Sequence, residues 1–119
     1  MTADTAGARE TAAAGANAAA DMFALEAMNG PFDGKQWQFE RSIIIGRDAA
    51  ATQATVPTDR TVSRKHAEVC AQTSGFELRD LKSSNGTFVD GRPISTSVII
   101  SARQPFVVGR TMLRVIELP

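Results

Sequence analysis

Short stretches in which apolar and polar residues alternate run along the chain from residue 32 to its end. In 67–72, alanine and valine alternate with glutamate, cysteine and glutamine. A period of two is typical of a strand with one buried face, because successive side chains point to opposite faces. Similar alternation, or a run of β-branched residues, predicts strands in 37–39, 42–45, 67–72, 76–80, 87–89, 93–94, 98–100, 106–108 and 112–118.

Tight-turn pairs separate several of these segments. Ser74-Gly75, Asn85-Gly86 and Asp90-Gly91 each stand between two predicted strands, and no amphipathic helix lies between them. Short strands joined by tight turns favour antiparallel pairing over a parallel sheet with crossover helices. We therefore expect residues 31–119 to form an all-β domain, an antiparallel sandwich or barrel.

The first 30 residues have a different composition. Twelve of them are alanine, and none is Ile, Val or Trp. Within this segment, Ala18–Met28 is rich in good helix formers, and Asn29-Gly30-Pro31 would end a helix. We expect residues 1–30 to be an acidic, alanine-rich tail that is flexible or partly helical, outside the folded domain.

Charge and composition exclude several classes of function. The chain of 119 residues has 13 basic and 13 acidic side chains, and residues 31–119 carry a net charge of only +3. Binding to long nucleic acids calls for a more basic domain, and no apolar run is long enough to cross a membrane. With a single cysteine and no secretory signal, the chain is expected to be cytoplasmic.

Three polar clusters stand at the ends of predicted strands: Gly46-Arg47-Asp48, residues 61–66 (Thr-Val-Ser-Arg-Lys-His) and residues 82–87 (Lys-Ser-Ser-Asn-Gly-Thr). Together they supply guanidinium groups, hydroxyls and a carboxamide, which are the groups that bind a tetrahedral oxyanion. No nucleophile–base pair, metal-ligand spacing or nucleotide-binding glycine loop accompanies them, so the sequence does not indicate an enzyme, a cofactor or a metal site.

In this order and spacing, Gly-Arg, Ser-Arg-Lys-His and Ser-Ser-Asn-Gly-Thr resemble the motifs of the forkhead-associated domain. The resemblance covers about Trp37–Leu118. It implies a β-sandwich of about eleven strands that binds phosphothreonine in partner proteins, downstream of a Ser/Thr protein kinase. One segment departs from the family pattern: Ile100–Pro105 replaces a Leu…Gly-Asp turn before the last strands.

The resemblance also implies roles for individual residues. Arg47 would donate charge-assisted hydrogen bonds to the phosphate, and Asn85 would hold the peptide main chain. A more variable loop would read the third residue after the phosphothreonine, where Arg60 would favour an acidic residue. The implied phosphothreonine and peptide contacts are Arg47, Ser63, Arg64, Ser84 and Asn85; the possible specificity residues are Arg60 and Thr61; the residues that support the loops are Gly46, His66 and Gly86.

Two further interpretations remain open from the sequence. The domain could instead be a phosphate-independent scaffold of a larger assembly, such as a secretion apparatus, although the presence of Arg47, Ser63 and Asn85 argues against this. The tail could also be an intramolecular ligand if Thr5 or Thr11 were phosphorylated, because a tethered ligand has a high effective concentration.

Overall fold

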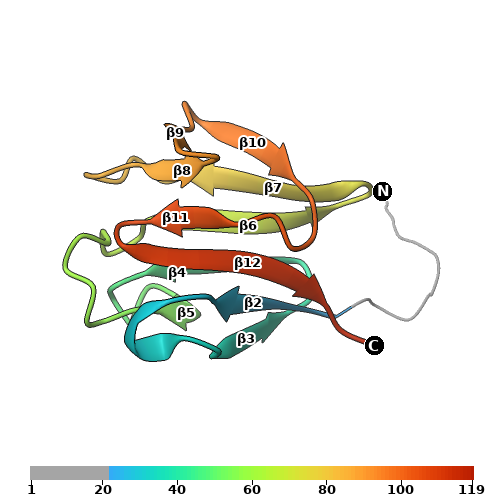
Figure 1. The fold of residues 1–119 in the computed structure, drawn as a ribbon, viewed down its shortest axis with the longest axis horizontal. Coiled ribbons are helices and arrows are strands. Elements are labelled where there is room, and N and C mark those ends of the chain that lie inside the picture. The colour runs from blue at the N-terminus through green and yellow to red at the C-terminus, as the bar shows by residue number, and fades with distance from the viewer. Residues whose placement is uncertain (1–21) are drawn as a thin grey trace.

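The structure, a computed structural model, describes residues 22–119, and in this part of the chain it is an all-β sandwich of two sheets (Figure 1). The five-stranded sheet contains, in spatial order, β10 (Ser97–Ile100), β7 (Gly75–Asp80), β6 (Ala67–Gln72), β4 (Ser42–Gly46) and β5 (Ala54–Thr55). The six-stranded sheet contains β3 (Gln36–Phe39), β2 (Phe23–Ala27), β12 (Thr111–Glu117), β11 (Phe106–Val108), β8 (Thr87–Val89) and β9 (Arg92–Pro93). All strand pairs are antiparallel except β4 with β5, so the predicted fold class is confirmed.

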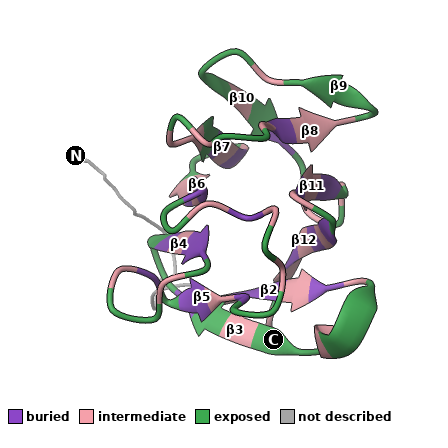
Figure 2. Cartoon of the chain, turned by 90° about the vertical axis from the view of Figure 1, so that its left-hand side faces the viewer, coloured by how far each residue is buried: buried purple, intermediate pink, exposed green. Residues whose placement is uncertain are grey.

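The core is formed by apolar rows that the two sheets turn toward each other. In the five-stranded sheet, Ile43 lies opposite Val69, and Val69 lies opposite Leu78. All three side chains are at most 1% exposed. Figure 2 shows such buried positions on the strands of both sheets. Because burial of each large apolar side chain contributes about 1.5–3 kcal/mol, this core holds the strand ends, and the loops that leave them, in fixed positions.

Strand β2 overturns the expectation of a helix in the N-terminal segment. Leu25 is fully buried and pairs with Val115 of β12 on one side and Trp37 of β3 on the other. The predicted helix over 18–28 is therefore wrong within 22–28, and residues 18–21 lie outside the described part. Helix propensities differ by less than about 1 kcal/mol per residue, so burial between two strands outweighs them.

The same strand corrects the predicted start of the folded domain. Residues 23–27 belong to the six-stranded sheet, so the sandwich begins before residue 31. The one helical element in the described residues is a single 3-10 turn, η1 (Gly30–Phe32), in the connection from β2 to β3. No helix in residues 22–119 is long and apolar enough to span a membrane.

Two turns show how local sequence fits this fold. Asp90 and Gly91 join β8 to β9 with φ values of 53° and 77°, which is the two-residue hairpin turn that Asp-Gly predicts. In the altered segment 100–105, Arg103 takes a φ of 70°, a left-handed conformation that usually favours glycine. The chain there still connects β10 to β11, so the departure from the family pattern is absorbed locally.

Candidate functional site

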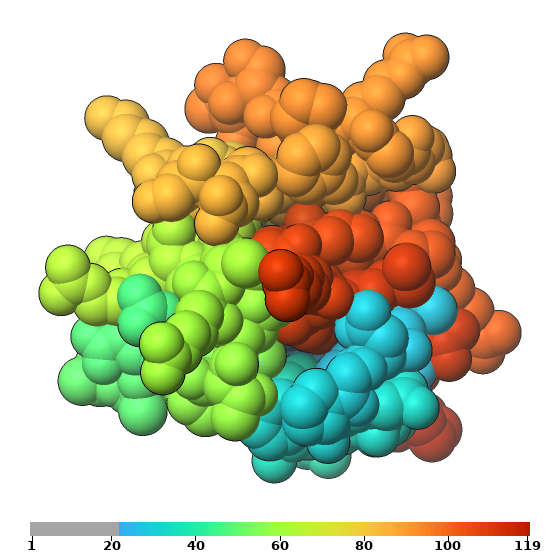
Figure 3. All heavy atoms as spheres, turned by 60° about the vertical axis from the view of Figure 1, so that its left-hand side comes forward, coloured from blue at the N-terminus to red at the C-terminus, as the bar shows by residue number. Residues whose placement is uncertain are grey.

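Loop segments from four places in the sequence meet at one end of the sandwich, which is the left-hand end in Figure 1. They follow β4 (from residue 47), precede β6 (56–66), follow β7 (81–86) and join β11 to β12 (109–110). Figure 3 shows this end, where the segments coloured for the sixties and the eighties lie beside the red segment of the β11–β12 connection. All three polar clusters from the sequence therefore lie at the same end of the molecule.

Gly46 lets two of these segments cross at van der Waals contact. A Cβ atom at this position would lie 2.0 Å from the carbonyl oxygen of Arg64. No side chain fits at that distance, so glycine is required here by close approach of the backbone. The crossing sets the chain after β4 against the chain before β6.

Arg47 is held on both its backbone and its side chain by the segment before β6. Its N–H donates to the carbonyl of Ser63 at 3.0 Å, and its Nε donates to the carbonyl of Val62 at 2.9 Å. The residue is exposed. Nε is thus engaged, whereas the two terminal nitrogens of the guanidinium make no hydrogen bond to any residue in the described part of the chain.

His66 joins the second and third clusters from inside the domain. Its side chain is fully buried, its Nδ1 accepts the N–H of Ser63 at 3.0 Å, and its Nε2 lies 2.8 Å from the carbonyl oxygen of Gly86. Since Nδ1 is an acceptor and Nε2 must donate, the ring has the neutral Nε2–H tautomer. This histidine supports the loops and is not at the surface.

The two serines of the motifs meet directly. Ser63 Oγ accepts the N–H of Ser84 at 3.0 Å, which leaves the hydroxyl hydrogen of Ser63 free to donate elsewhere. Ser84 is exposed, and its hydroxyl lies in the same loop as Asn85. The structure thus brings the hydroxyl of Ser63, from the second cluster, to the backbone of Ser84 in the third cluster.

Asn85 links the third cluster to the loop before β6. Its Nδ2 donates to the carbonyl of Thr61 at 2.8 Å. The following Gly86 has a φ of +87°, and a Cβ there would lie 3.3 Å from the ring of Phe88. The side chain of Asn85 is therefore anchored by its nitrogen, while its oxygen remains available as an acceptor.

The remaining predicted site residues differ in whether their side chains are hydrogen-bonded to the protein; they are Arg60, Thr61 and Arg64. Thr61 donates from its hydroxyl and its N–H to the carboxylate of Asp59, so its side chain is turned toward the protein. Arg60 and Arg64 are exposed, as is Lys65. Of the two predicted specificity residues, only Arg60 leaves its side chain free for a ligand.

Asp80, to which the sequence assigned no role, organises the third loop. It accepts hydrogen bonds from Ser83 Oγ at 2.5 Å, from the Ser83 N–H at 3.2 Å and from Thr87 Oγ1 at 2.8 Å. Burial raises the pKa of Asp80, but the hydrogen bonds from Ser83 and Thr87 outweigh this and leave the pKa below its usual value. Ser83 in turn accepts the N–H of Gly86 at 2.9 Å, as expected of a turn residue.

Asp59, which also had no assigned role, lies in the loop before β6. In addition to Thr61, it accepts the N–H of Arg110 at 2.9 Å and the hydroxyl of Thr111 at 2.8 Å. Burial raises the pKa of this carboxyl, but the hydrogen bonds together lower it by more, so the pKa of Asp59 lies below its usual value. In the sequence, only the position of Asp59 two residues before Thr61 could have indicated this role. The other two donors, Arg110 and Thr111, lie about 50 residues away along the chain.

The other groups that could bind a metal or act as a nucleophile are isolated in the described part of the chain. Within 22–119, no three His, Cys, Asp or Glu side chains are grouped closely enough to hold a metal ion. Burial and the neighbouring Glu68 raise the pKa of the Cys70 thiol, which makes it a poor nucleophile.

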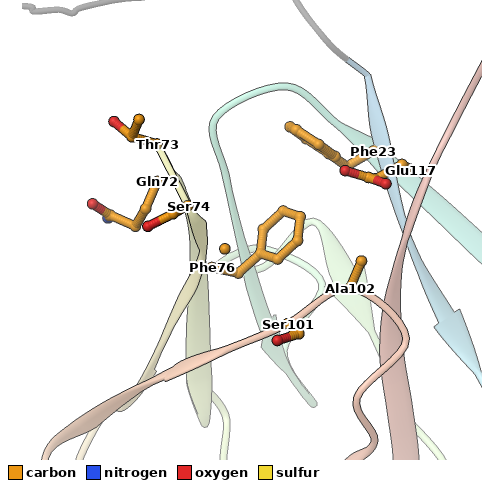
Figure 4. A pocket seen from close by; sticks show the side chains of 9 residues that line it. Phe23, Gln72, Thr73, Ser74, Phe76, Ser101, Ala102 and Glu117 are labelled. Carbon is orange, nitrogen blue, oxygen red and sulfur yellow. The ribbon is translucent and has the colours of Figure 1, made fainter.

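A hollow of about 290 Å³ lies at the opposite end of the sandwich (Figure 4). It is formed by the β6–β7 turn, the chain after β10, and the outer ends of β2 and β12. Phe23 and Phe76 form its apolar side, and their rings pack edge to face with centroids 5.0 Å apart. None of the residues in the three polar clusters lines it.

Comparison with known proteins agrees with this geometry. The family model of the FHA domain matches residues 43–109, which is more than half of the chain. The FHA domain-containing protein FhaB of Mycobacterium tuberculosis is 32% identical over 74 residues, which are 62% of this chain and 46% of FhaB. The chain thus spans less than half the length of this relative.

Solved structures show the same fold. The FHA domain of the CT664 protein from Chlamydia trachomatis has a TM-score of 0.74 and 25% identity, with 82% of this chain and 99% of that chain covered. A domain solved in a study of phosphothreonine-dependent FHA domain interactions has a TM-score of 0.69 and 29% identity, with 83% and 98% covered.

Proposed function

The chain belongs to the FHA domain family, and from that premise we propose that it binds a phosphothreonine-containing segment of a partner protein at the loop end of the sandwich. FHA domains bind phosphothreonine peptides and act as interaction modules. One observation carries the proposal: Arg47 and Asn85 are each anchored through one side-chain nitrogen and keep other polar atoms available, and Ser63 Oγ accepts one hydrogen bond while its hydroxyl hydrogen can still donate.

The free atoms match the chemistry of the ligand. Phosphothreonine carries a charge of about −1.5 to −2 and three acceptor oxygens. The terminal nitrogens of Arg47 and the hydroxyl of Ser63 would donate to these oxygens, with further donors from Ser84 and Arg64. Asn85 Oδ1 would accept an N–H of the peptide main chain, since its nitrogen is occupied by Thr61.

The loop before β6 supplies a candidate for sequence preference. Arg60 is exposed there and would favour an acidic residue at the third position after the phosphothreonine. Thr61 would act through its main chain, because its hydroxyl is engaged by Asp59. A preference for phosphothreonine over phosphoserine would rest on burial of one methyl group, worth about 0.8 kcal/mol.

We further propose that the chain catalyses no reaction, takes no cofactor, and recruits partners phosphorylated by a Ser/Thr kinase. A tail phosphorylated at Thr5 or Thr11 would compete for the same site; both residues lie outside the described part of the chain. A cytoplasmic location stays a prediction. The second candidate function is a phosphate-independent scaffold. Such a scaffold does not require three anchored polar side chains that keep donors and acceptors available.

The test is fluorescence anisotropy with labelled 15-residue peptides from an oriented phosphothreonine library, each compared with its unphosphorylated and phosphoserine forms. We expect dissociation constants near 1 μM, or about −8 kcal/mol, for the phosphothreonine peptides, about fourfold weaker binding for the phosphoserine forms, and no measurable binding of the unphosphorylated forms. Arg47→Ala should weaken binding more than tenfold, because a charge-assisted hydrogen bond is worth about 1.5–3 kcal/mol. Arg41→Ala, an exposed arginine in the β3–β4 connection, is the matched control and should not change affinity.

Binding that is equal for phosphorylated and unphosphorylated peptides would contradict the proposal and favour the scaffold. A loss of affinity shared by the Arg41 and Arg47 variants would reduce the role of Arg47 to general charge. Absence of acidic residues at the third position among the selected peptides would remove the role given to Arg60.

A further inference from the structure

We propose that Asp59 is a positioning residue of this binding site: its carboxylate fixes a turn whose carbonyl groups hold the side chains of Arg47 and Asn85 in their ligand-facing orientation. The inference deepens the proposed function and rests on it. It is carried by a chain of hydrogen bonds that runs from the β11–β12 connection, through Asp59, to the two side chains.

The first link is the carboxylate itself. One oxygen of Asp59 accepts the N–H and the hydroxyl of Thr61, and the other accepts the N–H of Arg110 and the hydroxyl of Thr111. The four donors come from two segments about 50 residues apart in the chain. A carboxylate can accept about four hydrogen bonds, so this one is saturated and joins the loop before β6 to the start of β12.

The second link is the turn that follows Asp59. The N–H of Val62 donates to the main-chain carbonyl of Asp59 at 3.1 Å, while the N–H of Thr61 donates to its side chain at 3.0 Å. Together these bonds close a turn over residues 59–62, in which the side chain of the aspartate imitates a turn of the backbone. The directions of the Thr61 and Val62 carbonyls are set by this turn.

The third link is what those two carbonyls hold. Thr61 O accepts Asn85 Nδ2 at 2.8 Å, and Val62 O accepts Arg47 Nε at 2.9 Å. These are the two side chains to which the proposed function gives the peptide main chain and the phosphate. Every step from the Asp59 carboxylate to them is a direct hydrogen bond or one peptide unit.

Close packing from the other side prevents the turn from relaxing into a different shape. A Cβ at Gly109 would lie 2.5 Å from Thr61 Oγ1 and 2.8 Å from Val62 Cγ2. The β11–β12 connection therefore lies directly against the turn, and Asp59 bonds its next two residues, Arg110 and Thr111. This contact gives the carboxylate a rigid support.

The proposal is testable because the two effects of the Asp59 carboxylate on ligand affinity are opposite: its charge repels a phosphate, whereas its hydrogen bonds support the side chains that would bind one. A carboxylate at the end of the domain that receives a phosphate repels the ligand, so a variant that removes only its charge should bind more tightly. If Asp59 positions Arg47 and Asn85, loss of its acceptors should weaken binding instead. Asp59→Asn removes the charge and converts one of the two acceptor oxygens to a donor group.

The experiment measures the full-length chain and its Asp59→Asn variant at a temperature where both are folded. Anisotropy with the tightest phosphothreonine peptide from the library gives the affinity, and ¹⁵N NMR of the free protein follows the Arg47 Nε–H and Asn85 Nδ2 signals. We expect about tenfold weaker binding, the factor of roughly one hydrogen bond, together with displaced signals of both side chains.

Asp48→Asn is the matched control. Asp48 lies at the same end, and one of its side-chain oxygens accepts the Ala50 N–H at 3.0 Å, a bond that the oxygen of an asparagine can keep. It undergoes the same change of charge and should leave affinity unchanged or slightly raised. If Asp59→Asn does not fold, Thr111→Val removes one of the four donors and should give about threefold weaker binding, a fraction of one hydrogen bond.

Three results would overturn the inference or separate it from the proposed function. Equal or tighter binding by the folded Asp59→Asn or Thr111→Val variant, with unmoved Arg47 and Asn85 signals, would show that Asp59 contributes stability alone. Equal weakening by Asp48→Asn would show that the loss of affinity is not specific to the turn held by Asp59. If the wild-type chain binds no phosphothreonine peptide, the proposed function fails, while the NMR signals of the free protein still decide whether Asp59 positions the two side chains.

Discussion

Gly46 is the residue at which the loop end tolerates least change. Its absent side chain is what allows the Arg64 carbonyl to approach, and the Cγ2 of Thr52 would lie only 2.9 Å from an added Cβ. The Arg64 carbonyl also accepts the N–H of Asp48 at 3.3 Å, so backbone groups on both sides of the crossing are engaged. An added methyl group would have to push backbone, not a flexible side chain.

Gly46→Ala is therefore expected to lower the free energy of unfolding by about 3 kcal/mol, the upper part of the range for overpacking. Urea denaturation followed by tryptophan fluorescence measures this. Gly34→Ala is a useful comparison, because Gly34 has a φ of +89° but nothing within 4 Å. Gly34→Ala should lower the free energy of unfolding by only about 1 kcal/mol, which is the cost of placing a residue with a side chain in the left-handed conformation. Equal losses in the two variants would contradict the close-approach argument.

Asp80 gives the domain a defined sensitivity to acid. The pKa of Asp80 in the folded chain is below its usual value, so the folded state binds a proton less readily than the unfolded state does. The stabilising contribution is complete above the unfolded pKa of about 3.9 and is lost as pH falls through the folded value. Asp80→Asn should remove this part of the acid dependence.

The measurement is the midpoint of thermal unfolding between pH 6 and pH 2.5 for the wild-type chain and Asp80→Asn. The variant is expected to be less stable at pH 6, where it lacks the charged acceptor, and to lose less of its stability on acidification. Asp33→Asn, at an exposed carboxyl for which no hydrogen bond is described, is the control. Parallel curves for wild type and Asp80→Asn would refute the prediction.

Among the elements, β2 has the largest effect on how the chain should be divided. It lies between β3 and β12 in the six-stranded sheet, so its removal would expose the edges of both neighbours and open the core at Leu25. An interior strand contributes backbone hydrogen bonds on both sides as well as buried surface. The folded unit therefore includes Phe23–Ala27, which lie before the change in composition near residue 30.

Truncation tests this limit. A chain of residues 22–119 retains β2 and is expected to unfold in one cooperative transition, whereas residues 31–119 should show no such transition by circular dichroism. Leu25→Ala in the full chain provides a milder version, with an expected loss of about 3 kcal/mol for a fully buried leucine. Cooperative unfolding of 31–119 would show that β2 is dispensable.

At the scale of the whole molecule, exposed basic side chains gather at the end of the sandwich where the loops after β4 and β7 and before β6 meet. Six exposed basic side chains lie in the loops there, and neither of the ion pairs between described residues, Arg79–Glu77 and Arg114–Glu26, involves them. Three acidic residues, Asp48, Asp59 and Asp80, lie in or beside the same loops. The basic residues are Arg47, Arg60, Arg64, Lys65, Lys82 and Arg110.

If this end receives a phosphorylated segment, binding should depend on salt. Raising ionic strength from 50 to 500 mM is expected to weaken phosphothreonine-peptide binding by about five- to tenfold, because exposed charges are screened within a few ångströms at the higher value. Anisotropy titrations at the two salt concentrations measure this, with thermal unfolding at the same concentrations as a check on the fold. Affinity that does not change with salt would restrict the electrostatic contribution to the directly contacting groups.

Several features of this protein were determined by the sequence alone. The alternating pattern in 67–72 and 76–80 and the Asp90-Gly91 turn predict strands and a hairpin, because side-chain period and turn conformation are local properties. The three motif clusters likewise identified Arg47, Ser63 and Asn85 as the candidate site. Their number and order along the chain were sufficient to recognise the family.

Only the tertiary structure decided the rest, and in each case the deciding interaction joins separate segments of the chain. Residues 23–27 form a strand because β3 and β12 flank them, whatever their helix propensity. Asp59 and Asp80 acquired their roles only when donors such as Thr111 and Thr87 were brought beside them. A local pattern sets what a segment can form, but burial and hydrogen-bond partners are supplied by the folded chain, and these decided that residues 23–27 join the sandwich and what holds the loops at its end.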